Sequence, residues 1–149
     1  MGKALIVYAT RTGETKRIGE LIAEGIRMQG QEADVRNVTG IKNAADLEGY
    51  DAYAFGSATY HGDMMQVMKK MLFLAEKAKL EGKVGGSFGA FGWSGEAPNL
   101  VLEIMKNRFE MDVVEPALRI KYNPDKKGLE ACRELGKVVA EKVLKKSLD

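Results

Sequence analysis

The sequence has little cysteine, histidine and proline, and it has no long apolar run. Cys132 is the only cysteine and His61 is the only histidine among 149 residues. One cysteine excludes an internal disulfide and any cluster held by several cysteines of this chain. One histidine excludes a two-histidine zinc motif and an iron site with several histidine ligands. We therefore predict no metal site, and any redox chemistry needs a bound organic cofactor.

The charge and the apolar content exclude two further classes of partner. No apolar run approaches the roughly 18 residues of a membrane span, so we expect no membrane association. Lys and Arg number 23 against 21 Asp and Glu, a formal net charge of +2, and this balance does not favour nucleic acid. The sequence opens directly into an apolar strand pattern rather than a signal peptide, so we expect a cytoplasmic protein.

Short apolar runs alternate with longer segments of helical period, and no low-complexity stretch divides them. This pattern predicts one α/β domain over residues 1–149. The predicted strands are 3–9, 33–38, 50–56, 84–91 and 117–122. The second is polar, which places it at an edge of the sheet. Right-handed crossovers then give a doubly wound sheet, whose ligands bind beyond the carboxyl ends of the strands.

The helical segments supply core faces rather than chemistry. One face of the helix expected after the third strand carries the apolar residues Met64, Val67, Met68, Met71, Leu72 and Ala75. Methionine stripes of this kind are typical of core packing. Cys132 falls on the apolar face of the last helix, so we interpret it as a core residue.

The loop after the first strand has the composition of an anion site. It consists of Thr10, Arg11, Thr12, Gly13, Glu14 and Thr15. Hydroxyl groups, a glycine and the free N–H groups of a first helical turn suit one phosphate monoester. The loop lacks the lysine of a nucleoside-triphosphate loop and the glycine pattern of a dinucleotide site. The alternative is that Thr12 or Thr15 only caps the helix.

The loops after the third and fourth strands each place a large aromatic residue beside glycine. The first contains Ser57, Ala58, Thr59, Tyr60, His61 and Gly62; the second contains Phe91, Gly92, Trp93, Ser94, Gly95 and Glu96. Two such aromatics suit the faces of a planar ring system. Alternatively, Trp93 folds back onto the core or docks a protein. His61 either titrates near the redox edge of a ring or is only solvated.

These motifs resemble those of flavodoxins along essentially the whole chain. The run Thr-Arg-Thr-Gly-Glu-Thr at 10–15 resembles the flavodoxin phosphate loop, and the segment 85–96 resembles more specifically the flavodoxin domain of flavodiiron proteins. Only the flavin half of such a protein is present, because the di-iron domain needs several histidines. The resemblance implies a short-chain, flavodoxin-like α/β/α three-layer sandwich, with a five-stranded parallel sheet of strand order 2-1-3-4-5, binding FMN.

Carried over by position, the resemblance implies roles for all three loops and no catalytic residue. Residues 10–15 hold the FMN phosphate, while residues 57–62 and 91–96 hold the isoalloxazine ring between Tyr60 and Trp93. The His61–Gly62 peptide turns when the flavin is half reduced, so that a carbonyl accepts a hydrogen bond from N5. Arg11 and Glu14 depart from the usual phosphate loop, with Arg11 either adding charge there or facing solvent.

The implied function is a low-potential electron carrier between redox enzymes rather than an enzyme with its own substrate. We expect redox partner proteins, a transient interface and a monomer or weak dimer, and the flavodiiron likeness suggests anaerobic metabolism. Flavodoxins are usually acidic, whereas this chain has a pI near 8.6, which leaves the usual electrostatic docking in doubt. The alternatives are an FMN-dependent NAD(P)H or quinone reductase of the same fold and a flavin-free interaction module.

Overall fold

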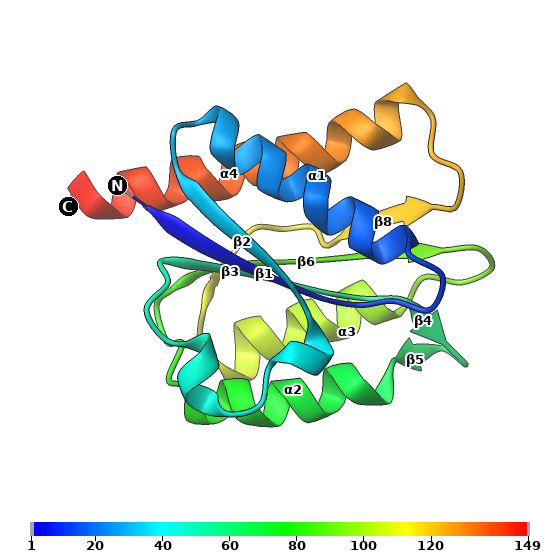
Figure 1. Ribbon diagram of the computed structural model, residues 1–149, viewed down its shortest axis with the longest axis horizontal. Coiled ribbons are helices and arrows are strands. Elements are labelled where there is room, and N and C mark those ends of the chain that lie inside the picture. The colour runs from blue at the N-terminus through cyan, green and yellow to red at the C-terminus, as the bar shows by residue number, and fades with distance from the viewer. Residues whose placement is uncertain (1, 149) are drawn as a thin grey trace.

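The computed structural model describes residues 2–148, which form a mainly parallel sheet between two pairs of helices (Figure 1). Helices α1 and α4 cover one face of the sheet, and α2 and α3 cover the other. The elements are β1 (Lys3–Ala9), α1 (Glu14–Met28), β2 (Glu32–Asn37), two 3-10 turns (Val38–Gly40 and Ala44–Leu47), β3 (Ala52–Ser57), β4 (Thr59–Tyr60), β5 (Asp63–Met64), α2 (Gln66–Lys77), β6 (Val84–Phe91), α3 (Ala97–Glu103) continued by a π-helical turn (Ile104–Arg108), β7 (Asp112–Val113), β8 (Leu118–Lys121) and α4 (Lys126–Leu148).

The order of the strands confirms the predicted doubly wound sheet. The strands run β2-β1-β3-β6, all parallel, and β2 lies at the edge as its polar sequence predicts. The fifth position is filled by two short strands rather than one. Strand β7 pairs with the beginning of β6, and β8 pairs with its end. Pro116 lies between them and has no N–H to donate to a ladder, so the sequence predicted only the second half.

Alternating side chains of the central strands build a core on each face of the sheet. Leu5 and Val7 of β1 pack toward α2 and α3, whereas Ile6 between them packs toward α1 and α4. Strands buried on both faces read as continuous apolar runs, which is why β1 and β6 have the bounds that the sequence predicts. None of the helices within residues 2–148 is both long and apolar enough to cross a membrane.

Helices α1 and α4 approach each other so closely that their contact has no room for side chains. A Cβ atom on Gly136 would lie 2.0 Å from the carbonyl oxygen of Ile22, and one on Gly25 would lie 2.0 Å from that of Arg133. Glycine at both positions therefore allows the two backbones to meet. The contact with α4 therefore fixes the position of α1, the helix that follows the first loop.

The prediction for the segment after β3 was wrong in three details. The stretch 57–63, expected to be a loop, contains the antiparallel hairpin of β4 and β5. Met64 belongs to this hairpin rather than to the helix, because α2 begins only at Gln66. Val67 does not share the buried face and is 37% exposed. Cys132 is buried in the core, as predicted.

Candidate functional site

The three candidate loops lie at one edge of the sheet, because β1, β3 and β6 are parallel neighbours (Figure 1). Hydrogen bonds between distant segments tie the loops to neighbouring elements. The Thr15 hydroxyl accepts a long bond of 3.4 Å from the backbone N–H of Ala90, which links the first loop to the end of β6, just before the third loop. The Thr59 hydroxyl accepts from the N–H of Ala97 at 3.0 Å, which links the second loop to the start of α3, just after the third loop. The structure therefore brings together the residues that the sequence places far apart.

The first loop presents free backbone donors at the start of α1. Gly13 has a φ of +97°, and its N–H donates to the Thr10 hydroxyl at 3.0 Å. The first helical bond runs from the N–H of Arg17 to the carbonyl of Gly13, so the N–H groups of residues 14–16 have no partner within the helix. Such a donor set, at the positive end of a helix dipole, fits a phosphate group.

The side chains of the first loop bear on the helix-capping alternative and on the place of Arg11. No side-chain hydrogen bond caps α1, and the buried Thr15 hydroxyl faces β6 instead. The simple capping interpretation therefore fails. The Arg11 guanidinium lies over the Tyr60 ring, 4.6 Å from its centroid, while the residue is exposed, so its added charge at the phosphate site stays a prediction. Thr12 donates a hydrogen bond to the Glu14 carboxylate, which keeps that charge within the loop.

The second loop is a tight hairpin turn with His61 and Gly62 at its two central positions. Tyr60 pairs with Asp63 across the turn, and the φ angles of His61 and Gly62 are +50° and +74°. Positive φ at both central positions defines a type I′ turn. Turning the peptide between them gives a type II′ turn, which favours glycine at the first position, where His61 stands. The predicted peptide movement therefore meets its main resistance at His61.

The two aromatic residues predicted to flank a ring are both exposed at this edge. Trp93 is 98% exposed and Tyr60 is 46% exposed. The ring of His61 meets that of Tyr60 edge-on, with centroids 4.3 Å apart. Trp93 does not fold back onto the core, which removes one of its alternatives. An indole in this position is open to contact with a ligand or a partner.

The structure adds two residues that the sequence did not indicate, Arg119 and Tyr122. The Arg119 guanidinium lies 5.3 Å from the centroid of the Phe91 ring. The Tyr122 ring lies 2.8 Å from the place where a Cβ of Gly92 would be. Both come from the fifth strand position, where alternation along β8 turns Arg119 outward. The alternation of exposed and buried residues along β8 could have indicated Arg119 from the sequence. The contacts of Arg119 and Tyr122 with the third loop, however, depend on the pairing of β8 with β6.

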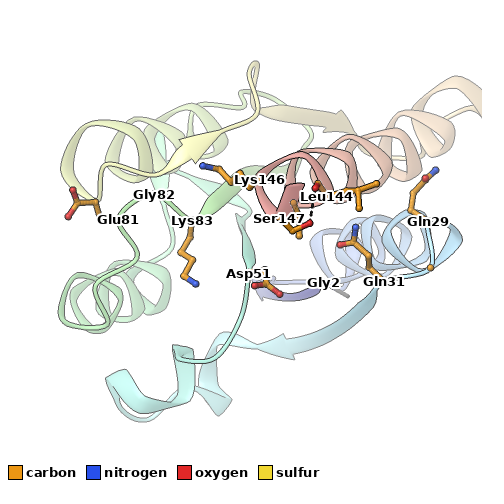
Figure 2. Close-up of a pocket in the computed structure, with 12 residues that line it drawn as sticks. Gly2, Gln29, Gln31, Asp51, Glu81, Gly82, Lys83, Leu144, Lys146 and Ser147 are labelled. Atoms are coloured by element: carbon orange, nitrogen blue, oxygen red, sulfur yellow. Dashed lines mark hydrogen bonds between the residues drawn. The ribbon is translucent and has the colours of Figure 1, made fainter. Parts of the chain in front are cut away.

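A large hollow lies away from these loops, at the opposite edge of the sheet (Figure 2). It has a volume of about 700 Å³, and its lining includes Gly2, Asp51 and Lys83, which precede or begin the central strands. Ligands of doubly wound sheets bind beyond the carboxyl ends of the strands. We therefore place the candidate site at the three loops and not in this hollow.

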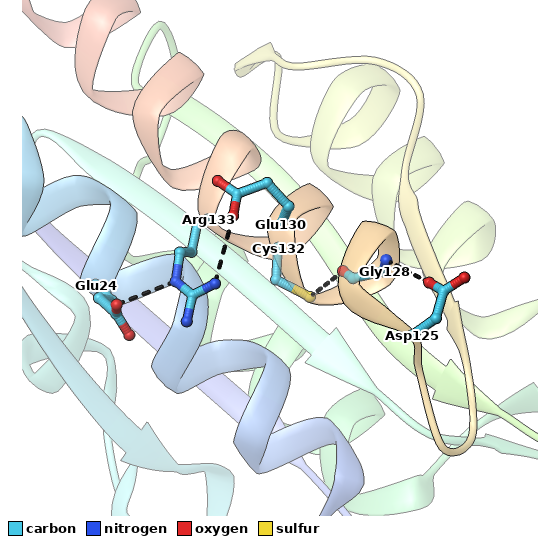
Figure 3. A network of polar contacts seen from close by, with 6 residues as sticks. All are labelled: Glu24, Asp125, Gly128, Glu130, Cys132 and Arg133. Carbon is cyan, nitrogen blue, oxygen red and sulfur yellow. Dashed lines mark hydrogen bonds and ion pairs between the residues drawn. The ribbon is translucent and has the colours of Figure 1, made fainter.

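Cys132 is not part of a reactive site. Burial raises the pKa of its thiol to about 11, and the Sγ donates to the carbonyl oxygen of Gly128 at 3.2 Å (Figure 3). The thiol is therefore neutral near pH 7, and a neutral buried thiol is a poor nucleophile.

Comparison with known proteins agrees with this geometry. Residues 5–113 match the family model described as the flavodoxin domain. A solved flavodoxin from the domain Archaea is 37% identical, has a TM-score of 0.89 and is matched over 98% of its chain and 95% of this one. The type A flavoprotein fprA of Rhodobacter capsulatus is 32% identical over 92% of this chain, which spans only 32% of that protein. The flavodiiron protein of Giardia intestinalis, at 24% identity, shares the fold with a TM-score of 0.88 over 95% of this chain and 36% of its own.

Proposed function

The chain belongs to the flavodoxin family, and from this membership we propose that its three loops bind one FMN and that the chain carries electrons between redox proteins. FMN is the cofactor of this family, and when bound it supplies one-electron and two-electron chemistry. The residues of this chain bind and orient it. The free N–H groups at the start of α1 hold the phosphate, and Tyr60 and Trp93 lie beside the ring.

One observation carries this proposal more than any other. The first-turn donors of α1 and the exposed Trp93 stand at the same edge of the sheet, and hydrogen bonds tie the first and second loops to the elements on either side of the third. Phosphate donors alone suit many ligands, and an exposed indole alone suits many partners. Together they suit a planar ring that carries a phosphate.

The loops favour a carrier over the alternative, an FMN-dependent NAD(P)H or quinone reductase. A reductase needs a cavity beside the flavin for its second substrate. The second loop is a hairpin with only His61 and Gly62 at its turn, and the segment between β6 and α3 is only 92–96. Neither is long enough to wall such a cavity. A carrier instead exchanges electrons across a transient interface, which at the low end buries less than about 1,200 Å².

The test is an anaerobic absorbance titration of the FMN-reconstituted protein with dithionite, followed by NADH and NADPH added to fresh oxidised samples. We expect bound flavin that dithionite reduces and that neither nucleotide reduces at a useful rate. Rapid reduction by a nucleotide would replace the carrier by the reductase. Failure to bind FMN after reconstitution would overturn the whole proposal.

We further propose that the chain acts in the cytoplasm as a monomer or weak dimer, whose redox partners bind transiently. Sedimentation of the FMN-loaded protein over a range of concentrations tests the oligomeric state. A tight dimer at low micromolar concentration would contradict it. Cell fractionation tests the location, and recovery outside the cytoplasm would contradict that part.

A further inference from the structure

We propose that the surface beside the candidate flavin loops docks an acidic redox protein, the reverse of the docking in which an acidic flavodoxin meets a basic partner. This inference rests on the proposed function, because it concerns the partner of the same site. The cations that carry it form what we call the basic face: Arg17, Arg119, Lys121, Lys126 and Lys127.

The basic face adjoins the third loop. Arg17, Lys121 and Tyr122 line one hollow of about 350 Å³ between α1 and the segment after β8. Arg119 stacks on Phe91 of the third loop. Lys126 and Lys127 are the first residues of α4.

The cations of the basic face have no ion-pair partner within residues 2–148. Seven other cations within the described residues are paired. Arg133 on α4 contacts Glu24 at 3.0 Å and Glu130 at 3.5 Å (Figure 3). Nearer the far end of the same helix, Lys142 contacts Asp112 at 2.9 Å. The charges of the basic face therefore remain available to a partner.

Nearby acidic groups offset the basic face only in part. Glu14 lines the same hollow as Arg17 and Lys121, and its carboxylate accepts a hydrogen bond from Thr12 within the first loop. Beside Lys126 and Lys127, the Asp125 carboxylate caps α4 and Glu130 is paired with Arg133. The phosphate of a bound FMN would add negative charge at that loop. Arg119, which contacts Phe91 on strand β6, lies outside the hollow that Glu14 lines. Arg119 is therefore the cation of the basic face that these acidic groups offset least.

The stability of the fold does not account for lysine at the start of α4. The Asp125 carboxylate accepts a hydrogen bond from the N–H of Gly128 at 2.9 Å and so caps the helix (Figure 3). Lys126 and Lys127 then occupy the first two helical positions, at the positive end of the dipole, where a cation is unfavourable. Docking of an acidic surface gives these two lysines a role that helix stability does not.

Electrostatic steering matches what a transient carrier needs. Complementary charge raises the rate of encounter by roughly 10-fold to 1,000-fold and loses its effect as salt screens it. It does so without the large buried interface that would slow release. The exposed Trp93 marks the point to which the steered partner is brought.

The experiment compares two metalloprotein acceptors of opposite charge in anaerobic stopped-flow. The FMN-loaded protein is reduced with dithionite, and the reductant is then removed. Mixing passes one electron from the flavin either to the Cu(II) of acidic plant plastocyanin or to the Fe(III) of basic cytochrome c. At low ionic strength we expect the plastocyanin rate to fall at least about 10-fold as salt reaches ~0.3 M, while the cytochrome c rate stays constant or rises.

Matched charge reversals locate the effect. We expect Lys127→Glu to lower the low-salt plastocyanin rate at least about threefold without lowering the melting temperature, because the new carboxylate suits the helix start. Lys145→Glu makes the same change 18 residues further along α4, about 27 Å away, and should leave the rate unchanged. The triple variant Lys121→Glu, Lys126→Glu and Lys127→Glu should reverse the preference toward cytochrome c.

The outcomes separate this inference from the function on which it rests. Absorbance before mixing shows whether FMN is bound, and its absence removes both proposals. If FMN is bound and reduced, three results each overturn the docking alone. These are a plastocyanin rate that salt does not change, a faster low-salt reaction with cytochrome c, and an equal loss in Lys127→Glu and Lys145→Glu.

Discussion

Replacing Trp93 by alanine separates a ligand-binding indole from a structural one. The side chain is 98% exposed in the FMN-free fold, so its removal deletes almost no packing. We expect the free energy of unfolding of the FMN-free Trp93→Ala protein to stay within about 0.5 kcal/mol of the parent, as for most surface substitutions. The change should instead appear in the affinity for FMN.

The magnitude follows from the area that a flavin ring would cover. An enclosed Trp buries roughly 150–250 Å², and a ring laid on one face covers about half of this, near 100 Å². At about 25 cal/mol per Å² this area corresponds to ~2.5 kcal/mol. The dissociation constant for FMN should then rise about 60-fold, since each 1.4 kcal/mol is roughly tenfold.

The assay is quenching of FMN fluorescence on titration with FMN-free protein, together with chemical unfolding of that protein. Phe73→Ala is the matched control, because Phe73 on α2 is also an exposed aromatic, at 68%, and lies outside the three loops. It should change neither quantity. An unchanged dissociation constant in Trp93→Ala would refute the stacking role, and a loss of more than about 1 kcal/mol of stability would refute the reasoning from exposure.

Further substitutions test the turn, the helix contact and the buried thiol. Gly62→Ala strains the unturned type I′ state, where its φ is +74°, but not the turned type II′ state, whose second central residue has a negative φ, so it should raise the yield of half-reduced flavin in a dithionite titration. His61→Gly relieves the first position of the turned state and should raise the yield too; unchanged yields in both variants would contradict the turn assignment. Gly136→Ala should lower the free energy of unfolding by roughly 3 kcal/mol by forcing α1 from α4. Gly40→Ala, with open space around it, serves as the control. Burial raises the pKa of the Cys132 thiol from 9.0 to about 11, so the contribution of this thiol to the free energy of unfolding is full below about pH 9 and is lost as the pH rises through 11. The free energy of unfolding of Cys132→Ala should therefore fall less over that range than that of the parent. Identical pH profiles would argue against a raised thiol pKa.

The parts of the fold that the sequence predicted well are those fixed by local patterns. Strands β1 and β6 are apolar on both faces, and the apolar run in each sequence ends where the strand leaves the core. The hairpin of β4 and β5 was missed because each of its strands has only two residues, too few for an alternation to show. Strand β7 was missed for the same reason, and Pro116 hides its continuity with β8.

The candidate site was predictable in its loops but not in its contacts. Glycine, hydroxyl and aromatic residues after buried strands identify the three loops from sequence alone. The stacking of Arg11 on Tyr60 and of Arg119 on Phe91 depends on which strands are neighbours and how far each loop turns. Neither contact can be predicted from local sequence, so the basic face could be recognised only in the folded chain.

The buried polar side chains explain why these loops have a defined shape without a ligand. Within residues 2–148 only three polar side chains are fully buried, Thr15, Ser57 and Ser87. The Thr15 and Ser57 hydroxyls accept from backbone N–H groups of distant segments, and the Ser87 hydroxyl donates to the carbonyl of Pro98 at 2.7 Å. A buried hydroxyl is tolerated only when it is hydrogen-bonded, so each one fixes the backbone it contacts. Because all three lie in or beside the elements that carry the loops, FMN would meet a backbone that is already ordered. Its affinity should then depend mainly on the phosphate donors and the exposed aromatics, with little lost to ordering the chain.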